Sequence, residues 1–369
     1  MKKIVFITPS LRGGGAERVV VHLLRHMNRD NIKLGLIALK LEGPYVSHLP
    51  DDAEIVDLGT RRVRHSIGKL IKELNRMQPD VVVSTLGHLN VALLALRPFL
   101  KNKPKIVLRE ANAPSFAMRK GKGGVKLYRT LYRMFYPKAD RVIALSRGMA
   151  DDLLSFSRMP KDKISIIHNP VVTEEIKRQA DEPLDHPWLR EKGAGRELPV
   201  CISVGRLVEQ KNYDMLLRSF AKAVRQTPAR LIILGEGPKR EHLTALIKEL
   251  GLEDKVELAG FTGNPYAYMA RADLFVMSSS FEGMPNVLLE ALAVGLPAVA
   301  TDCIGVPDVL DDGRYGTMIP VGAEDALAEA IVNALREQTE GIGDRQRERA
   351  KQFHIEKIAG EYRQLLTSV

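Results

Sequence analysis

The chain has 369 residues, of which 45% are hydrophobic and 27% are charged, an ordinary composition for a soluble globular protein. At roughly 100 to 200 residues per domain, it is long enough for two domains with separate cores. This composition, with only two cysteines, excludes a disordered chain, a collagen-like repeat and a disulfide-rich scaffold. No stretch approaches the ~18 uninterrupted apolar residues of a membrane-spanning helix.

The net charge of +10 is distributed unevenly along the chain. Residues 1–150 carry 28 Lys and Arg against 11 Asp and Glu, whereas residues 151–369 carry 27 against 34. The excess is largest in residues 101–150, where 13 basic residues accompany only Glu110 and Asp140. We therefore expect the first half to contact an anionic partner.

Short apolar runs alternate with helical patterns along nearly the whole chain. In the first half, the runs expected to form strands are Lys3–Thr8, Leu34–Leu39, Asp80–Thr85, Lys105–Leu108, Arg141–Leu145 and Lys163–Ile167. In the second half they are Val200–Val204, Arg230–Leu234, Lys255–Ala259, Leu274–Met277, Ala298–Thr301 and Thr317–Ile319. Helical spacing marks Ala16–Met27, Tyr213–Gln226, Lys239–Leu250 and Asn286–Ala293. This alternation predicts an α/β protein with two doubly wound parallel sheets of about six strands each.

A segment rich in charge, proline and glycine separates the two series of elements. It predicts an N-terminal domain of residues 1–178, a linker of residues 179–198 and a C-terminal domain of residues 199–352. Cys201 and Cys303 each lie inside an apolar run, so they are expected to be reduced core residues of a cytosolic chain.

Glycine-rich loops follow several predicted strands, at the sheet edge where doubly wound proteins bind ligands. Gly13, Gly14 and Gly15 follow the first strand, and their backbone could approach a ligand at the start of a helix. A tight strand-to-helix turn is the alternative. The spacing is not that of a dinucleotide fingerprint or a P-loop.

The loop that follows the first strand of the second half carries two cations, Arg206 and Lys211. Two cations in one short loop before a helix can hold a diphosphate, although solvated surface charges are the usual alternative.

Two carboxylates flank a later predicted helix. Glu282 precedes it and Glu290 lies within it, eight positions on, which is about 80° of helical rotation, so both can border one crevice. The alternative for Glu290 is a side chain that extends to solvent. Pro285 is expected at the first helical position, which would leave the amides of residues 286–288 available to a phosphate or sugar oxygen.

In this order and spacing, the residues resemble the family 4 glycosyltransferases of the GT-B fold, from Ile4 to about Ala359. The motifs that carry the resemblance are Gly13–Glu17, Val142–Ser146, Ile167–Pro170, Ser203–Leu207, Gln210–Asn212, Leu234–Pro238 and Glu282–Glu290, the last being the family's E-x7-E signature. The resemblance implies two Rossmann-like domains that face a cleft, with a C-terminal helix, residues 353–369, packing back on the first domain.

The resemblance also implies an activity. We expect an enzyme that moves a sugar, with retention of anomeric configuration, from a nucleotide diphosphate sugar to a saccharide or polyprenyl-linked saccharide in bacterial surface polysaccharide synthesis. A UDP-sugar is expected ahead of a GDP-sugar, and no metal or other cofactor is expected. Two alternatives are a nucleotide-sugar-modifying enzyme such as an epimerase, which needs no acceptor, and a non-catalytic nucleotide- or glycan-binding module, which consumes no donor.

By the same resemblance, the catalytic residues are Arg206, Lys211 and Glu282. The two cations would neutralise the leaving nucleotide, and Glu282 would contact hydroxyls of the donor sugar. Glu290 would contact the ribose hydroxyls, and the backbone near Phe261 would face the base. Further donor contacts are expected at Gly14, Gly15, Gly205, Gly235, Gly260, Met284, Pro285, Asn286 and Val287, with Gly14 and Gly15 contributed by the opposite domain.

Many members of the family have a His after the fourth strand of the first domain, where this chain has Ala111. The polar contact near the acceptor is then expected from Arg109, Glu110 or Asn112.

A basic segment, residues 118–136, predicts a contact of a different kind. From residue 125 onward it has an apolar helical face, and Lys126, Arg129 and Arg133 share another face. Such a helix can lie on an anionic bilayer or bind the diphosphate of a polyprenyl-linked acceptor, and a core helix with a solvated basic face is the alternative. We expect a cytoplasmic protein at the inner face of the membrane. Nucleic acid is not expected, and the sequence does not indicate an oligomeric state.

Overall fold

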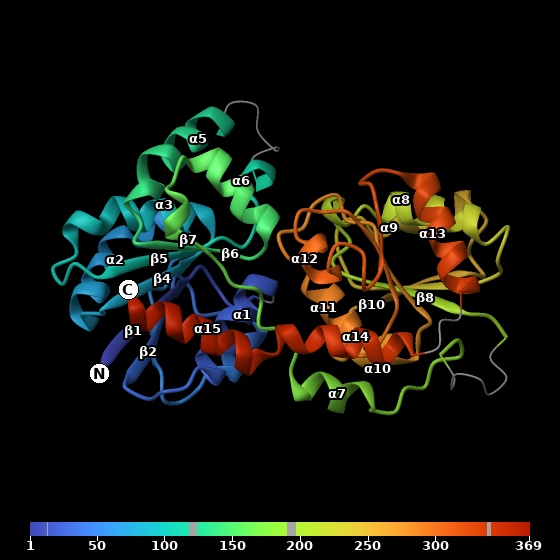
Figure 1. Cartoon of the computed structure of the whole chain (residues 1–369), viewed down its shortest axis with the longest axis horizontal. Helices are drawn as coiled ribbons and strands as arrows, with labels where there is room; N and C mark the ends of the chain where they lie inside the picture. The colour runs from blue at the N-terminus through green and yellow to red at the C-terminus, as the bar shows by residue number, and fades with distance from the viewer. Residues whose placement is uncertain (13, 118–123, 190–196, 338–340) are drawn as a thin grey trace. The chain divides into compact units, whose positions relative to one another are not determined.

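The computed structural model describes residues 1–12, 14–117, 124–189, 197–337 and 341–369, which form two compact units (Figure 1). Unit 1 comprises Met1–Pro170 together with Ile355–Val369, and unit 2 comprises Val171–His354. Residues 171–178, which were predicted to end the first domain, belong to unit 2. The reason is that helix α7 (Glu174–Ala180) packs on helix α10 (Pro265–Arg271). The side chain of Asn264 also donates a hydrogen bond to the Gln179 carbonyl at 2.8 Å.

Unit 1 is built on a seven-stranded parallel sheet in the order β3-β2-β1-β4-β5-β6-β7. Its strands are β1 (Lys2–Thr8), β2 (Ile32–Ala38), β3 (Glu54–Asp57), β4 (Val81–Thr85), β5 (Lys105–Arg109), β6 (Arg141–Ala144) and β7 (Ile164–Ile166). The six strands predicted for this half are present, and β3 is an addition. Strand β3 forms no continuous apolar run because it has four residues, lies at the sheet edge and buries none of them fully.

Helices cover both faces of this sheet. On one face lie α1 (Gly15–His26) and the C-terminal helix α15 (Ile355–Ser368). On the other lie α2 (Val63–Met77), α3 (Gly87–Leu96), α5 (Gly124–Phe135) and α6 (Arg147–Ser157), and the short α4 (Pro114–Ala117) follows β5. The predicted basic helix is α5, while residues 118–123 of the basic segment lie outside the described residues.

Unit 2 has a six-stranded parallel sheet in the order β10-β9-β8-β11-β12-β13. Its strands are β8 (Val200–Val204), β9 (Arg230–Leu234), β10 (Val256–Gly260), β11 (Leu274–Met277), β12 (Ala298–Thr301) and β13 (Thr317–Ile319). One face is covered by α8 (Tyr213–Ala223), α9 (Arg240–Glu249) and α13 (Glu324–Arg336). Further helices are α7, α10, α11 (Asn286–Ala293), α12 (Val306–Leu310) and α14 (Ile342–Ala350), of which α10 and α14 both contact α11. All six strands predicted for this half are confirmed.

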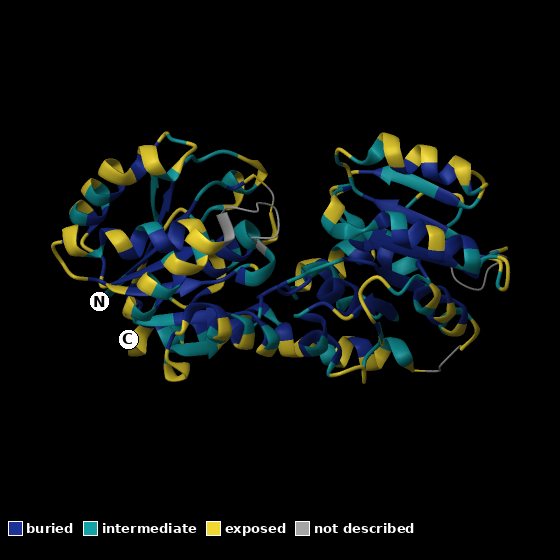
Figure 2. Cartoon of the chain, turned by 90° about the horizontal axis from the view of Figure 1, so that it is seen from above, coloured by how far each residue is buried: buried dark blue, intermediate teal, exposed yellow. Residues whose placement is uncertain are grey.

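The strand order reverses once in each sheet, between β1 and β4 in unit 1 and between β8 and β11 in unit 2. Most residues of the central strands are buried, and the helices that cover them expose their outer faces (Figure 2). Because all strands of a sheet run parallel, the loops that follow them meet at one edge, and ligands of such sheets bind where the order reverses. Ligand sites are therefore expected at these two edges.

Two expectations drawn from composition can be compared with the structure. Both cysteines are buried and free. In the parts of the chain described above, no helix has the length and apolar character needed to cross a bilayer.

Helix α15 is fastened to unit 1 by a buried aromatic side chain. Tyr362 is fully buried in the cluster that contains Ile4 and Phe6 of β1, and Ile358 of the same helix joins it there. The Tyr362 hydroxyl also accepts a hydrogen bond from Arg109 Nε at 3.1 Å. Helix α15 thus contributes to the core of unit 1, although about 180 residues of unit 2 precede it in the chain.

We expect Tyr362→Ala to lower the free energy of unfolding of unit 1 by about 3–5 kcal/mol, because truncating a buried aromatic leaves a cavity. Urea denaturation followed by circular dichroism measures the change. Gln364→Ala, at an exposed position of the same helix, is the matched control and should change it by less than about 0.5 kcal/mol. Equal effects of the two substitutions would contradict this role of α15.

Candidate functional site

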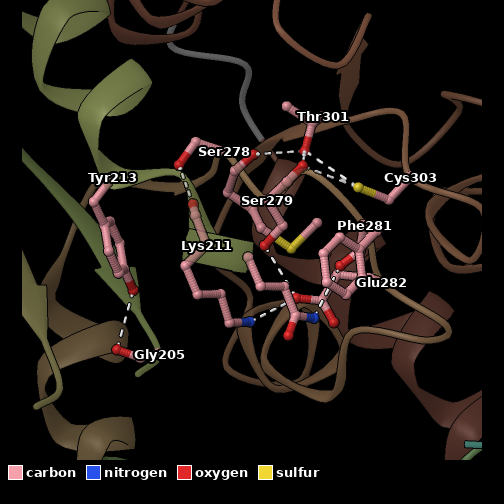
Figure 3. A network of polar contacts seen from close by, with 11 residues as sticks. Gly205, Lys211, Tyr213, Ser278, Ser279, Phe281, Glu282, Thr301 and Cys303 are labelled. Carbon is pink, nitrogen blue, oxygen red and sulfur yellow. Dashed lines mark hydrogen bonds and ion pairs between the residues drawn. The ribbon is translucent and has the colours of Figure 1, made fainter. Parts of the chain in front are cut away.

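An ion pair joins the two loops at the point in unit 2 where the strand order reverses. Lys211 ends a short turn after β8, and Glu282 lies in the loop between β11 and α11. Lys211 Nζ lies 2.7 Å from Glu282 Oε1, and the two side chains are only 18% and 11% exposed (Figure 3). The structure thus brings together two of the predicted catalytic residues, and partial burial holds the pair in place.

Polar contacts around this pair lock the two loops together. Ser279 Oγ donates to Glu282 Oε1 at 3.0 Å, and Ser278 Oγ donates to the Lys211 carbonyl at 2.8 Å (Figure 3). Gln210 Nε2 donates to the Phe281 carbonyl at 2.9 Å. Sequence reasoning did not assign roles to Ser278, Ser279 or Gln210, although a run of serines at a strand end was a visible signal.

Side chains at the end of strand β12 and just after it donate hydrogen bonds to the same loop. Thr301 Oγ1 donates to the Ser279 carbonyl at 2.7 Å, and Cys303 Sγ donates to that carbonyl at 3.0 Å. Desolvation raises the pKa of Cys303 to about 12, so its thiol stays protonated and serves as a hydrogen-bond donor.

Arg206, the third predicted catalytic residue, lies in the same loop as Lys211 but is exposed. Within the described residues it makes no ion pair or hydrogen bond through its side chain. The β8 loop therefore carries one cation engaged with Glu282 and one cation open to an anionic ligand.

Glu290 lies on α11 and is 4% exposed, and Tyr266 Oη donates to its Oε1 at 3.5 Å. Helix α11 begins at Asn286, with Pro285 as its N-cap, so the expected first helical position was one residue early. The Leu288 amide donates to the Pro285 carbonyl at 3.1 Å, so the prediction that it would be available to a ligand was wrong.

The strand ends of β8, β9 and β10 are packed backbone against backbone. The amide of Gly235 donates to the Gly260 carbonyl at 2.7 Å, and a Cβ on Gly235, where φ is +143°, would overlap the Gly205 carbonyl oxygen. Only glycine fits there. Beyond Gly260, the Phe261 side chain is 81% exposed, so an aromatic ring lies at the position predicted to face the base.

The glycine loop of unit 1 caps helix α1. The Gly14 amide donates to Glu17 Oε2 at 2.8 Å, and Ser10 Oγ donates to Glu17 Oε1 at 2.7 Å. Gly14 and Gly15 are exposed, whereas Gly13 lies outside the described residues. The Gly14 amide is therefore used by the helix cap in this structure.

Two of the three predicted acceptor residues are buried. Arg109 is 1% exposed and donates from Nη2 to Asn169 Oδ1 at 2.6 Å, besides its bond to Tyr362. Glu110 is 3% exposed, and only Asn112 is exposed to solvent. This arrangement suits Arg109 and Glu110 to positioning the end of β5 rather than to touching an acceptor directly.

Glu110 is the centre of a buried hydrogen-bond network. The hydroxyls of Tyr132 and Tyr136 on and after α5 donate to its Oε1, as does Asn90 Nδ2 from α3 at 2.9 Å. Desolvation raises the pKa of Glu110 to about 7, although these hydrogen bonds oppose the shift. The network attaches α5 to the end of β5.

The outward side of α5 combines charge with apolar side chains. Lys126 and Arg129 are exposed, Arg133 is half-buried, and Leu127 and Met134 are 63% and 50% exposed. The Val125 side chain lies outside the described residues.

In the described ranges, no group of three or more His, Cys, Asp or Glu side chains could hold a metal ion.

Comparison with known proteins adds the family. Residues 13–175 match the family model described as Glycosyltransferase Family 4, and residues 198–337 match the one described as Glycosyl transferases group 1. The chain is 33% identical, over 97% of its own length and 98% of the relative's, to the N-acetylgalactosamine-N,N'-diacetylbacillosaminyl-diphospho-undecaprenol 4-alpha-N-acetylgalactosaminyltransferase of Campylobacter jejuni. It is 28% identical, over 97% of both chains, to the lipopolysaccharide core biosynthesis glycosyltransferase LpsE of Rhizobium meliloti.

Among solved structures, HepE of Anabaena in complex with UDP is similar in fold. Its TM-score is 0.79 at 21% identity, and the similarity covers 100% of both chains. The same protein has been solved with UDP-glucose. The expectation of two Rossmann-like domains of the GT-B type is thereby confirmed.

The raised pKa of Glu110 predicts a pH dependence of stability. Between its ordinary pKa of 4.5 and about 7, the folded state binds a proton that the unfolded state releases, so stability falls as pH rises through this range. The fall is at most about 1.4 kcal/mol per pH unit. Glu110→Gln stays neutral throughout and should flatten this dependence in urea denaturation at pH 5 and pH 7.5.

Glu356→Gln, at an exposed position of unit 1, is the control and should leave the dependence as it is. If Glu110→Gln and the unaltered chain lost stability in parallel over this range, the burial of a protonated Glu110 would be disproved.

Proposed function

Because the chain belongs to the family 4 glycosyltransferases, we propose that it transfers a sugar from a nucleotide diphosphate sugar to a saccharide linked to a polyprenyl diphosphate. The observation that carries the proposal is the Lys211–Glu282 pair, with the exposed Arg206 in the same loop as Lys211, at the edge of unit 2 where the strand order reverses. The UDP complexes of HepE support a UDP-sugar ahead of a GDP-sugar as donor. The printed name of the Campylobacter jejuni relative supports a diphosphate-linked lipid acceptor.

In the proposed reaction, the bond between the anomeric carbon and the phosphate oxygen breaks, and a bond to the acceptor hydroxyl oxygen forms on the same face of the sugar. Because the new bond forms on the face from which the phosphate leaves, the configuration is retained, and the hydroxyl proton passes to the departing phosphate oxygen. Negative charge develops on the departing diphosphate, where Arg206 and Lys211 stabilise it. Charge neutralisation is thus assigned to two side chains of the β8 loop rather than to a metal ion.

The carboxylates have positioning roles in this proposal. Glu282 holds Lys211 through Oε1 and can accept hydrogen bonds from donor-sugar hydroxyls through its second oxygen. Glu290 is assigned to the ribose hydroxyls, and the backbone at Gly260 and Phe261 to the base. The loop residues Gly205, Gly235, Met284, Pro285, Asn286 and Val287 complete the proposed donor contacts of unit 2, and Gly14 and Gly15 are proposed as contacts from unit 1.

We assign the outward side of α5 to the membrane surface. Lys126 and Arg129 supply charge for anionic lipid headgroups, and the exposed Leu127 and Met134 supply apolar surface that can enter the headgroup region. The buried Glu110 network holds this helix against the end of β5, where the acceptor sugar would be bound.

Lys211→Ala and Glu290→Ala should each lower turnover by a factor of roughly 10² to 10³, because the first removes a cation from the departing diphosphate and the second removes the contact that positions the ribose of the donor. The assay is sugar transfer from UDP-sugars to a diphosphate-linked saccharide, with circular dichroism to verify folding. Lys248→Ala, at an exposed position of unit 2, is the control. Near-normal turnover in both site variants would contradict the site assignment.

Reversing the three charges of α5, with Lys126→Glu, Arg129→Glu and Arg133→Glu, should abolish binding to anionic vesicles at low salt. Leu127→Ser with Met134→Ser should weaken binding without changing its salt dependence. Sedimentation with phosphatidylglycerol vesicles measures both effects. A matched reversal at Arg218, Arg225 and Lys248 of unit 2 should have no effect, and absence of vesicle binding by the unaltered chain would contradict the membrane assignment.

A further inference from the structure

A cavity of about 430 Å³ lies in unit 1, apart from every residue assigned so far. Its apolar lining is Pro9, Leu39 and Val63, and its cations are Arg61, Arg62 and Arg64. His88 also lines it, but burial lowers the pKa of His88, so this side chain is uncharged at neutral pH. These residues follow strands β1, β2, β3 and β4 in the chain. The cavity therefore lies at the sheet edge that binds ligands in doubly wound proteins, where the strand order of unit 1 reverses.

The carboxylate that pairs with Arg61 of the cavity is shared among several cations. Glu42 pairs with Arg61 at 3.2 Å, with Lys40 at 3.1 Å and with Arg12. Desolvation opposes these contacts, but together they lower the pKa of Glu42 to about 2, so it stays charged at any physiological pH. One carboxylate thus serves three cations, and it leaves the remaining arginines of the cavity without compensation.

Arg62 and Arg64 are exposed, and neither has a carboxylate within ion-pair distance in the described part of the chain. Arg64 Nε donates to Nε2 of its neighbour His65 at 3.2 Å. Two uncompensated guanidinium groups on the wall of one cavity create a local positive potential that favours an anion.

The chemistry of the wall indicates which anion fits. Guanidinium groups bind phosphate oxygens through two parallel hydrogen bonds, and two of them suit a ligand with two phosphoryl groups. A volume of about 430 Å³ is within the usual range for organic ligands, and it holds a diphosphate together with part of an attached group. The apolar lining residues Pro9, Leu39 and Val63 can accommodate the non-polar part of such a ligand.

We propose that this cavity binds the diphosphate of the acceptor. The inference rests on the proposed function, in which donor and acceptor each carry a diphosphate. Arg206 and Lys211 of unit 2 are assigned to the donor, and the cavity of unit 1 supplies a separate pair of cations for the acceptor. Arg62 and Arg64 thereby select diphosphate-linked acceptors over neutral ones.

The test compares two acceptors that carry the same saccharide, one linked to a short polyprenyl diphosphate and one linked to a neutral alkyl group. Arg62→Ala with Arg64→Ala should raise the KM for the diphosphate acceptor by roughly tenfold or more, because two charge-assisted contacts are lost. It should leave the KM for the neutral acceptor, and kcat at saturation, unchanged. Lys33→Ala with Lys72→Ala removes the same charge from other exposed positions of unit 1 and should change neither KM.

Two results would overturn the inference. One is an unchanged KM for the diphosphate acceptor in the arginine variant, and the other is an equal rise for both acceptors. A third arm separates the acceptor from membrane lipid, since loss of binding to phosphatidylglycerol vesicles without acceptor would assign the cavity to lipid headgroups instead.

The proposed function can fail independently. If the unaltered chain transfers sugar to neither acceptor, the proposed function is wrong. If it transfers sugar normally but the arginine variant does so with an unaltered KM, the assignment of this cavity alone is wrong.

Discussion

The ion pair between Lys211 and Glu282 is the constraint on which the rest of the site depends. It joins loops that come from β8 and β11, the two strands between which the order of the second sheet reverses. Around it, Ser278 and Ser279 bind both partners, and Thr301 and Cys303 hold the Ser279 backbone from the next strand. A cation held in this way needs no rearrangement when charge develops on a departing diphosphate, and that is the physical basis of electrostatic catalysis.

Among the described residues, each unit has a cluster of basic side chains in which one carboxylate pairs with some of the cations and leaves others unpaired. In unit 2, Glu282 engages Lys211 and leaves Arg206 open. In unit 1, Glu42 engages three cations and leaves Arg62 and Arg64 open. In both, a carboxylate fixes the geometry of a basic cluster while uncompensated arginine remains at the ligand-binding edge of a parallel sheet. The proposed glycosyl transfer between two diphosphate-bearing substrates would give each cluster a ligand.

Much of the architecture could be predicted from the sequence, because continuous apolar runs identify strands that are covered on both faces. The twelve predicted strands are present, and so is the helix that carries Glu290. The pairing of Lys211 with Glu282 across two loops was not derivable from spacing, since it depends on which strands lie side by side. The family resemblance assigned both residues to the donor site, but it did not predict that they pair.

The failures of sequence reasoning have specific causes. Strand β3 is short, lies at the edge and has no fully buried residue, so it was missed. Without it, Arg61, Arg62 and Arg64 could not be placed at the edge where the loops after the strands meet. The anionic contact was therefore predicted for the more basic segment of residues 101–150. Arg109 and Glu110 were expected to face an acceptor because the family resemblance implies a polar contact after this strand, where this chain has Ala111 instead of His. Here Asn169, Tyr362 and the tyrosines at α5 cover them, through contacts from residues distant in sequence.

The central claim is that the Lys211–Glu282 edge of unit 2 holds the donor's diphosphate, and nucleotide binding tests it most directly. Thermal unfolding of the full chain would be measured with UDP, GDP and ADP, for the unaltered protein and for Lys211→Ala. At about 100 times its dissociation constant, UDP should stabilise the unaltered protein by roughly 2.7 kcal/mol, GDP and ADP should do so less at the same concentration, and Lys211→Ala should lose most of the UDP effect. Equal stabilisation of both proteins by UDP, or no stabilisation by any nucleotide, would contradict the account.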